Sequence, residues 1–391
     1  MTRSAKAHGK VFAVYDMSSS SVAGAHVLAT TTEGKPKTVF LASSRINAPL
    51  QEDMDMQRFV EETVKHLGEV VANIRKADVH HPSYIQVTLA SPWYTAQTRT
   101  ILYKKDMPFV CTQKLIDTII ADEIEHILSK EKGSFGVFGT ESVIVEKQLS
   151  TIILNGYHTT NPLGKKATTL ELSLTITIAP KAILDRFTDV LRRVYGATHI
   201  GFTTSPFTTF VVMRDLNPAT EDCVVIDVGE EVTDVAFIKH GIVLYQHSFP
   251  VGTYGLYRAL AGQSSNTARE SMTLLESYRL GKLSSRAAQS IETSITAFVT
   301  HWQSWFHQIL DTGEYGFCIP EHCIVTTDPR FELLFAQTLG KDMFVQQCCS
   351  TGAVRVLVTN EELFRPQVST LDQTPLDIPL ATTALFVERL L

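Results

Sequence analysis

The sequence predicts an α/β protein made of two related halves. Short apolar runs typical of strands alternate along the chain with longer amphipathic stretches typical of helices. Both halves open with a strand, an aspartate, a polar turn and a second strand, once at Asp16 and again at Asp227. A chain of 391 residues has room for two to three domains, at about 150 residues each.

The first half opens as a β-meander followed by a helix. Strands are predicted at 11–15, 22–28 and 38–43. Turns rich in Ser, Gly and Pro separate these strands. A helix is predicted from Met56 to Ile74, because its apolar residues recur every three or four positions. A fourth strand is predicted over 84–89.

The middle of the chain, residues 83–180, is predicted to be a separate α/β unit. Strands are predicted at 97–103, 143–154 and 168–178, the last with clear alternation of Leu and Ile. Thr112 is placed to cap a helix that runs to Leu128. The segment 155–164 is rich in turn residues.

The second half begins at about residue 220, after Asn217-Pro218. Strands are predicted at 224–228, 234–238, 242–247, 323–325 and 343–347. We expect a tight turn at His240-Gly241, a mostly helical block over 252–311 and a helix after Pro329. Trp302, Trp305 and Phe306 share one helical face with Leu310. Aromatic residues at this spacing more often pack in a core than bind a partner, so we expect them in the core.

The composition excludes several classes of protein. Hydrophobic residues make up 44% and charged residues 19%, which excludes a disordered chain, a coiled coil and a collagen-like fibre. Lys+Arg 35 against Asp+Glu 41 gives a net charge of −6, so we expect no nucleic-acid partner. The sequence has no run of 18 apolar residues, and its polar N-terminus does not resemble a signal peptide. We therefore expect no direct membrane insertion.

Cysteine and histidine give no metal-binding pattern. The cysteines are Cys111, Cys223, Cys318, Cys323, Cys348 and Cys349. Their spacing does not match a zinc site, and we expect reduced, mostly buried thiols in a cytoplasmic protein. His80 and His81 have no third ligand nearby and are expected in a solvated loop.

The two hairpins together indicate a site for an anion and a metal. A hairpin turn can direct several backbone N–H groups at one anion. A carboxylate at a strand end suits Mg²⁺, directly or through water. Two such hairpins facing each other across a cleft would put Asp16 and Asp227 on either side of one ligand.

In these features the chain resembles the actin-like ATPase superfamily, and most closely its bacterial FtsA/PilM group. The matches cover nearly the whole chain in the expected order. They are the phosphate-1 loop from Asp16 to Val22, the phosphate-2 loop from Asp227 to Asp234, the segments Ala90-Ser-Pro-Trp93, Leu154-Asn-Gly-Tyr157 and Asn161-Pro-Leu-Gly-Lys-Lys166, and the final helix at Asp377-Ile-Pro-Leu-Ala-Thr-Thr-Ala384.

The resemblance implies a two-lobed actin-like fold of duplicated ribonuclease-H-like domains with a 1C-type α/β insertion. The first lobe (1A) would comprise 1–82 and 181–219 with the C-terminal helix 371–391. The 1C subdomain would comprise 83–180. The second lobe would comprise 220–370 (2A/2B), with 2B at about 252–320.

The resemblance also implies a cleft for ATP and Mg²⁺. The implied nucleotide-binding residues are Asp16, Ser18, Ser19, Ser20, Asp227, Gly229, Thr233 and Asp234. Asp16 and Asp227 would hold Mg²⁺ through water, and the resemblance implies no particular catalytic residue.

The nucleotide motifs depart from the family pattern. Glu230 and Glu231 replace two glycines of the phosphate-2 loop. A carboxylate about 4 Å from a phosphate oxygen costs about 4 kcal/mol at an effective dielectric near 20, or roughly a thousandfold in affinity. The strand at 323–325 runs into Thr326-Thr327-Asp328 where the family has glycines for adenosine. Ala268 to Met272 lacks the acid and the lysine of a second adenosine segment.

We therefore interpret the chain as a cytoplasmic actin-like scaffold with a weakened or lost ATP site. By the resemblance it would bind a cytoplasmic peptide of an inner-membrane pilus or cell-division protein, and could self-associate through the 1C subdomain. The C-terminal helix lacks the basic face of a membrane-surface helix, so we expect it to pack into the fold. The alternatives are an active ATPase that polymerises with ATP-Mg, as FtsA-like proteins do, and, less well matched, a metabolic kinase of the same superfamily.

Overall fold

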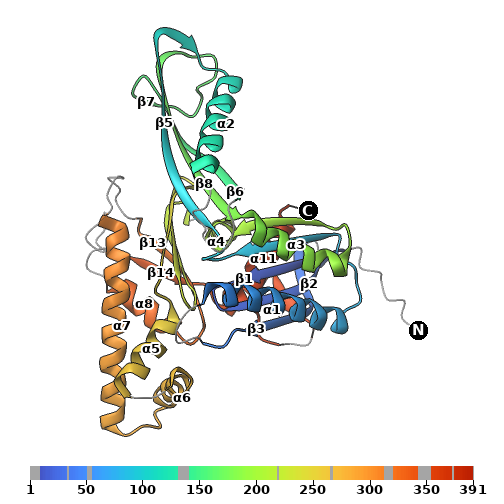
Figure 1. Cartoon of the computed structure of the whole chain (residues 1–391), viewed down its shortest axis with the longest axis vertical. Coiled ribbons are helices and arrows are strands. Elements are labelled where there is room, and N and C mark those ends of the chain that lie inside the picture. The colour runs from blue at the N-terminus through green and yellow to red at the C-terminus, as the bar shows by residue number, and fades with distance from the viewer. Residues whose placement is uncertain are drawn as a thin grey trace.

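The computed structural model describes the chain in nine segments. They are residues 9–32, 35–50, 55–130, 141–217, 220–264, 267–311, 320–341, 354–371 and 374–390. These residues form two lobes, each built on its own sheet, and a third unit that projects from them (Figure 1). The strand predicted at 343–347 and the thiols Cys318, Cys348 and Cys349 lie outside the described residues.

The first lobe is a six-stranded sheet with helices on both faces. Its strand order is β15-β3-β2-β1-β4-β9, with β1, β2 and β3 antiparallel and β4 and β9 parallel to β1. The strands are β1 (Lys10–Met17), β2 (Ser21–Thr32), β3 (Lys35–Asn47), β4 (Tyr84–Leu89), β9 (His199–Thr204) and β15 (Val368–Thr370). Alternate residues of β1 face opposite sides, so Tyr15 packs against α1 (Met56–Ala77) and α3 (Lys181–Tyr195), whereas Val14 packs against α4 (Ser205–Leu216) and α11 (Ile378–Glu388).

The second lobe repeats the same arrangement. Its strand order is β12-β11-β10-β13-β14, again an antiparallel meander followed by two strands parallel to the first. The strands are β10 (Cys223–Val228), β11 (Thr233–Lys239), β12 (Ile242–Phe249), β13 (His322–Thr327) and β14 (Arg355–Val358). The helices are α5 (Thr253–Ser264), α6 (Ala268–Arg279), α7 (Ser285–Asp311), α8 (Glu332–Gly340) and α10 (Glu361–Phe364). The internal repeat inferred from the two hairpins is therefore present in the sheets.

One apolar core joins the two lobes. It contains Val14 of β1, Val225 of β10, Phe210 of α4 and Leu380 of α11, all fully or almost fully buried. Because both sheets turn one face toward these two helices, the strand ends that carry Asp16 and Asp227 are brought together. The C-terminal helix packs in the fold, as expected, and is buried at Ile378, from Leu380 to Leu385 and at Val387.

The projecting unit is a four-stranded sheet covered by one helix. Its order is β5-β8-β6-β7, all antiparallel. Its elements are β5 (Thr95–Val110), α2 (Gln113–Lys130), β6 (Ser142–Leu154), β7 (Tyr157–His158) and β8 (Lys166–Pro180). The alternating apolar residues of β8 are buried against α2, as their pattern predicts.

Buried polar contacts fix the base of the projecting unit to both lobes. Glu146 of β6 accepts from Thr203 Oγ1 (2.6 Å) and from the Thr204 N–H (2.7 Å) of β9. Thr98 and Thr175 donate to the Leu244 carbonyl of β12, at 2.8 and 3.0 Å. Burial raises the pKa of Glu146, while the donors from Thr203 and Thr204 oppose that rise.

Two boundaries differ from the sequence-based prediction. Residues 84–89, placed in the inserted unit, form β4 between β1 and β9 of the first sheet. Val368–Thr370, placed in the second lobe, pairs with β3 at the edge of the first sheet. Both differences arise because strand pairing is long-range, so a boundary in sequence does not reveal which sheet a short strand joins.

The described cysteines and the two histidines at 80 and 81 lie where the sequence predicts them. Cys111, Cys223 and Cys323 are buried free thiols. His80 is largely exposed and contacts Asp78, which also contacts buried His26 at 2.7 Å. Among the described helices, none is long and apolar enough to span a membrane.

The aromatic cluster of α7 lies in the core of the second lobe. Trp302 and Phe306 are fully buried, and Trp302 Nε1 donates to Thr233 Oγ1 at 3.0 Å. Trp305, partly buried, stacks on Phe249 with ring centroids 6.4 Å apart.

Trp302→Ala should therefore destabilise the protein strongly. The change leaves a cavity and removes one of the two hydrogen bonds of the buried Thr233 hydroxyl, and we expect a loss of about 3–5 kcal/mol in the free energy of unfolding. Trp305→Ala is the matched control and should lose roughly half of that or less, because its ring is only partly buried. Urea unfolding followed by circular dichroism measures both, and equal losses would contradict the packing described.

Candidate functional site

The cleft between the lobes lies where the first hairpins of the two sheets meet. Asp16 is near the end of β1 and Asp227 near the end of β10, each followed by a turn into the next strand. A cavity of about 300 Å³ lies between them and is lined by residues of both lobes and of α11. This volume is at the lower end of the range for small-molecule pockets.

Most, but not all, of the predicted nucleotide-binding residues line this cavity. Those that do are Asp16, Ser18, Ser19, Asp227, Gly229 and Asp234. Ser20 and Thr233 do not. The Thr233 hydroxyl is fully buried on the other side of β11, where it donates to the Val251 carbonyl at 2.6 Å and accepts from Trp302. Thr233, implied by the resemblance to bind nucleotide, therefore does not face this cavity, because neighbouring strand residues face opposite sides of the sheet.

The carboxylate of Glu230 lies among the hydroxyls of the first turn. Ser18 Oγ donates to Glu230 Oε2 at 3.1 Å, Ser19 Oγ to the same oxygen at 3.2 Å, and Ser21 Oγ to Oε1 at 3.4 Å. These hydroxyls belong to the loop that resembles phosphate-1, and the carboxylate belongs to the loop that resembles phosphate-2. Glu230 therefore takes the hydrogen-bond donors that would otherwise face an anionic ligand.

Glu231 points elsewhere. Its side chain forms an ion pair with Arg258 of α5 at 2.5 Å, and only its backbone reaches the first turn, where the N–H donates to Ser19 Oγ at 3.0 Å. Of the two glutamates that replace glycines, one enters the cleft and the other does not.

Gly229 allows the two turns to approach. A Cβ at this position would lie 3.0 Å from the Val232 carbonyl and 3.3 Å from Ser19 Oγ. Both distances are too short for an ordinary side chain, so a larger residue would push the turns apart. The absence of a side chain at Gly229 therefore lets the two turns pack closely, and it would also let a ligand approach the backbone.

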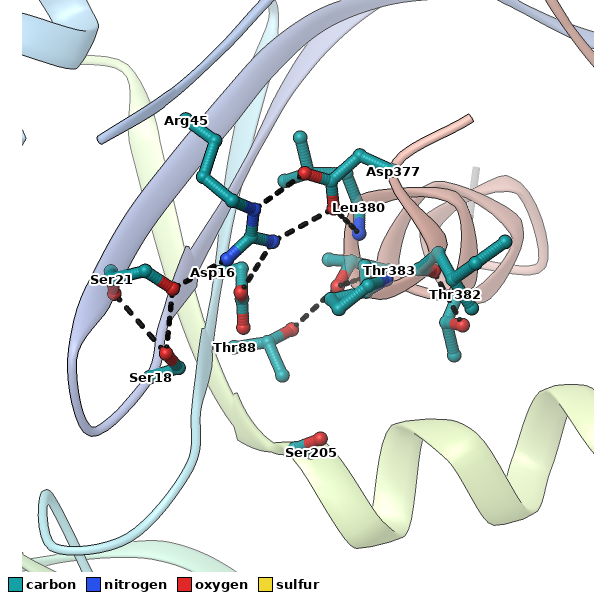
Figure 2. Close-up of polar contacts among 12 residues, drawn as sticks. Asp16, Ser18, Ser21, Arg45, Thr88, Ser205, Asp377, Leu380, Thr382 and Thr383 are labelled. Atoms are coloured by element: carbon teal, nitrogen blue, oxygen red, sulfur yellow. Dashed lines mark hydrogen bonds and ion pairs between the residues drawn. The ribbon is translucent and has the colours of Figure 1, made fainter. Parts of the chain in front are cut away.

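Arg45 of β3 occupies the other side of the first turn (Figure 2). Its guanidinium donates to Asp16 Oδ2 at 2.9 Å, to Asp377 Oδ2 at 2.6 Å and to Ser21 Oγ at 2.6 Å. Burial raises the pKa of Asp16 to about 6, and the charge of Arg45 opposes that rise. Burial would lower the pKa of Arg45, but Asp377 and Asp16 hold it above its usual value. The carboxylate predicted to hold Mg²⁺ through water is thus already paired with a cation.

Two further carboxylates of the second lobe accept hydrogen bonds from serines of the first. Asp227 accepts from Ser205 Oγ at 2.5 Å, and Asp234 accepts from the Ser91 N–H at 3.0 Å. Burial raises the pKa of Asp227 to about 8, opposed by the Ser205 hydroxyl and reinforced by Asp234. Burial also raises the pKa of Asp234, opposed by donors from Ser248 and Ser91. The cleft therefore concentrates acidic groups that repel a polyphosphate when ionised.

The end expected to hold adenosine carries side chains instead of glycines. Thr326 and Thr327 line the cavity, and Thr327 Oγ1 is buried with no hydrogen-bond partner in the part of the chain described. Asp328 pairs with Arg330 at 2.7 Å. Glu270 of the second candidate adenosine segment closes a capping box with Thr267 at the start of α6 and is not part of the cavity.

Sequence reasoning missed four residues that build the cleft: Arg45, Ser91, Ser205 and Asp377. Ser91 and Asp377 lie within segments that matched the family, yet nothing in those segments assigns their side chains a role. Arg45 is the one charged residue between Thr38 and Asn47 of β3, where its neighbours are apolar or small. An isolated charge in such a strand is the signal that could have indicated a buried ion pair.

Comparisons with known proteins agree with this architecture. No family model matches the sequence, and no curated protein matches it significantly. A chain of the PilM-PilN type IV pilus biogenesis complex is similar in structure, with a TM-score of 0.59, 13% identity and 97% of each chain covered. The ethanolamine utilization protein EutJ from Carboxydothermus hydrogenoformans has a TM-score of 0.46 at 12% identity, over 97% of this chain and 89% of that one. A Bacteroides thetaiotaomicron protein with an actin-like ATPase fold has a TM-score of 0.39 at 8% identity, over 97% and 96%.

The first of these similarities, with the duplicated sheets, identifies the fold. The chain has the two-lobed actin-like fold, so the fold predicted from its motifs is confirmed. The resemblance to PilM-like proteins is likewise confirmed at the level of the fold.

Asp227→Asn should change how stability depends on pH. Burial raises the pKa of Asp227 to about 8 in the folded protein, whereas the ordinary pKa of an aspartate is 3.8. Between these values the unfolded chain has lost the proton that the folded chain keeps, so stability falls as pH rises through this window. The Asn variant has no carboxyl at this position, so it lacks this fall in stability. Its free energy of unfolding relative to wild type should rise by on the order of 2 kcal/mol between about pH 5 and about pH 8.

Ser205→Ala provides the matched control, with the opposite sign. It removes the hydroxyl that stabilises ionised Asp227 and so raises the pKa of Asp227 further, and the decline in stability should continue to higher pH than in wild type. Urea unfolding at a series of pH values measures both variants. Curves parallel to wild type for Asp227→Asn would contradict the assignment of a buried, protonated carboxyl.

Proposed function

We propose that this chain is an actin-fold scaffold that neither needs nor hydrolyses ATP and that binds an inner-membrane protein of a type IV pilus assembly machine. One observation carries the proposal: the carboxylate of Glu230 lies in the serine turn where a phosphate would bind. Arg45 also pairs with Asp16, which in a working site would face the metal. Both groups that would handle ATP-Mg are engaged within the chain.

The partner is proposed from the whole-chain likeness to the PilM-PilN complex, which covers 97% of both chains. That complex joins PilM to PilN in type IV pilus biogenesis. By analogy this chain would stay in the cytoplasm and reach the inner membrane through its partner's cytoplasmic peptide. A role in cell division has no comparable support here.

A groove on the projecting unit is the proposed site for that peptide. It has a volume of about 1030 Å³ and lies between α2 and the sheet. Its apolar lining includes Ile120, Ile124, Leu128, Ile144 and Leu149. Ser142 Oγ, also in the lining, is buried and has no hydrogen-bond partner among the described residues. An unpaired hydroxyl in an apolar groove is suited to a peptide backbone.

The charge of this groove favours one kind of occupant. Among the described residues, its lining contains three acids and one base. They are Asp117, Glu125, Glu141 and Lys147. Cytoplasmic segments next to membrane-spanning helices carry an excess of Lys and Arg. An apolar peptide with basic residues, from the cytoplasmic side of a membrane partner, therefore fits the groove by shape and by charge.

Calorimetry with ATP and Mg²⁺ tests the loss of nucleotide binding. We expect no saturable binding at micromolar concentration, because a carboxylate about 4 Å from a phosphate weakens binding by roughly a thousandfold. Saturable, Mg²⁺-dependent binding would instead support the alternative, an active ATPase. Asp16 and Asp227 would then hold Mg²⁺ through water, and Ser18, Ser19 and Gly229 would contact phosphate.

Ile124→Asp tests the groove. A charge among the apolar residues should weaken peptide binding by at least about tenfold. Thr118→Asp is the control, because Thr118 is exposed on the same helix and is not part of the groove. The probes are labelled synthetic peptides that copy the cytoplasmic segments of membrane proteins encoded beside this chain's gene, measured by fluorescence anisotropy.

Equal binding by the two variants would place the peptide site elsewhere. If instead the wild type associates with itself and Ile124→Asp abolishes that, the groove is an interface between copies of the chain. Sedimentation velocity on the wild type and on both variants separates these outcomes.

A further inference from the structure

We infer that Glu230 acts as an internal ligand for an oxyanion-binding turn at Ser18–Ser21 and so holds the two lobes together in place of a bound phosphate. The inference rests on the proposed function, since it explains how a nucleotide-independent actin fold keeps its cleft closed. By this inference the turn can bind phosphate and related oxyanions, and the Glu230 carboxylate takes their place.

The turn has the geometry of an anion site. Three hydroxyls converge on one carboxylate, and the Arg45 guanidinium stands next to them through Ser21. The Ser18 N–H donates to the Ser21 carbonyl at 3.0 Å and closes the turn. Trp93 Nε1 donates to the Ser18 carbonyl at 3.0 Å. The donors are therefore fixed in place by contacts that do not involve Glu230, and would remain without it.

The position of Glu230 is also fixed by its own lobe. Its carbonyl accepts from the Tyr254 N–H at 2.7 Å, and the Gly229 carbonyl accepts from the Thr253 N–H at 2.9 Å. A Cβ on Gly252 would lie 2.4 Å from the Glu230 carbonyl oxygen, so this packing requires glycine at residue 252. The carboxylate is thus carried on a backbone that is held by the start of α5.

The contact links residues 212 positions apart in the sequence, from the phosphate-1 turn of one lobe to the phosphate-2 turn of the other. In a working nucleotide site the same two turns would face the phosphates between them. Here a side chain of one turn supplies the negative oxygens that the other turn binds. The lobes are joined with no ligand, and the anion site is filled.

Glu230→Ala should uncover this site. We expect the variant to bind inorganic phosphate at least about tenfold more tightly than wild type in calorimetry, because three hydroxyls next to the Arg45 charge lose their internal anion. Amide hydrogen exchange of the two turns should become faster in the variant and slow again when phosphate is added. Glu231→Ala is the matched control and should bind phosphate as wild type does, since Glu231 pairs with Arg258 outside the cleft.

Glu230→Gln covers the case in which the alanine variant does not fold. It keeps the shape and an acceptor but not the carboxylate, so its turns should exchange at a rate between those of wild type and Glu230→Ala. Folded Glu230 variants that bind phosphate no better than wild type, with unchanged exchange in the turns, would overturn the inference.

The outcomes separate this inference from the proposed function. ATP-Mg binding by the wild type would refute the nucleotide-independent scaffold. Phosphate affinity that is unchanged by loss of the Glu230 carboxylate refutes only the internal ligand.

Discussion

The contact between the two hairpin turns is the constraint on which the cleft depends. Each sheet ends one strand in a carboxylate and a polar turn, and the shared core of α4 and α11 brings these ends together. Polar groups brought together with little water between them must find partners, or the fold loses about 1–3 kcal/mol for each group left unpaired. Serine hydroxyls of the first lobe and carboxylates of the second satisfy that requirement for each other.

These contacts divide donors and acceptors between the lobes. Ser18, Ser91 and Ser205 donate from the first half, and Glu230, Asp234 and Asp227 accept from the second. The duplicated topology places equivalent strand ends opposite each other. Their sequences differ, so that serines of the first half face carboxylates of the second. A ligand between the turns would need donors from both of them. Here the donors of one turn bind the acceptors of the other directly, which explains how the cleft can be well formed without a ligand.

The same arrangement explains why a likeness in fold does not by itself carry an activity. The chain keeps the two sheets, the hairpins and the inserted unit of the actin-like fold. Within that frame, Arg45 pairs with Asp16, threonines stand where adenosine would need glycine, and a glutamate enters the serine turn. The fold is thus the same while the groups that line its cleft differ, and an activity depends on those groups.

The local elements and the two hairpins follow from short-range patterns in the sequence. The spacing of apolar residues fixed α1 and β8, and His240-Gly241 fixed the tight turn, where both residues adopt positive φ. Three features depend on how the elements pack: Thr233 faces the core, residues 84–89 join the first sheet, and Arg45 pairs with Asp377. The reason is physical: period and turn chemistry act over a few residues, whereas the pairing of Arg45 with Asp377 spans 332 positions and exists only once the core has closed.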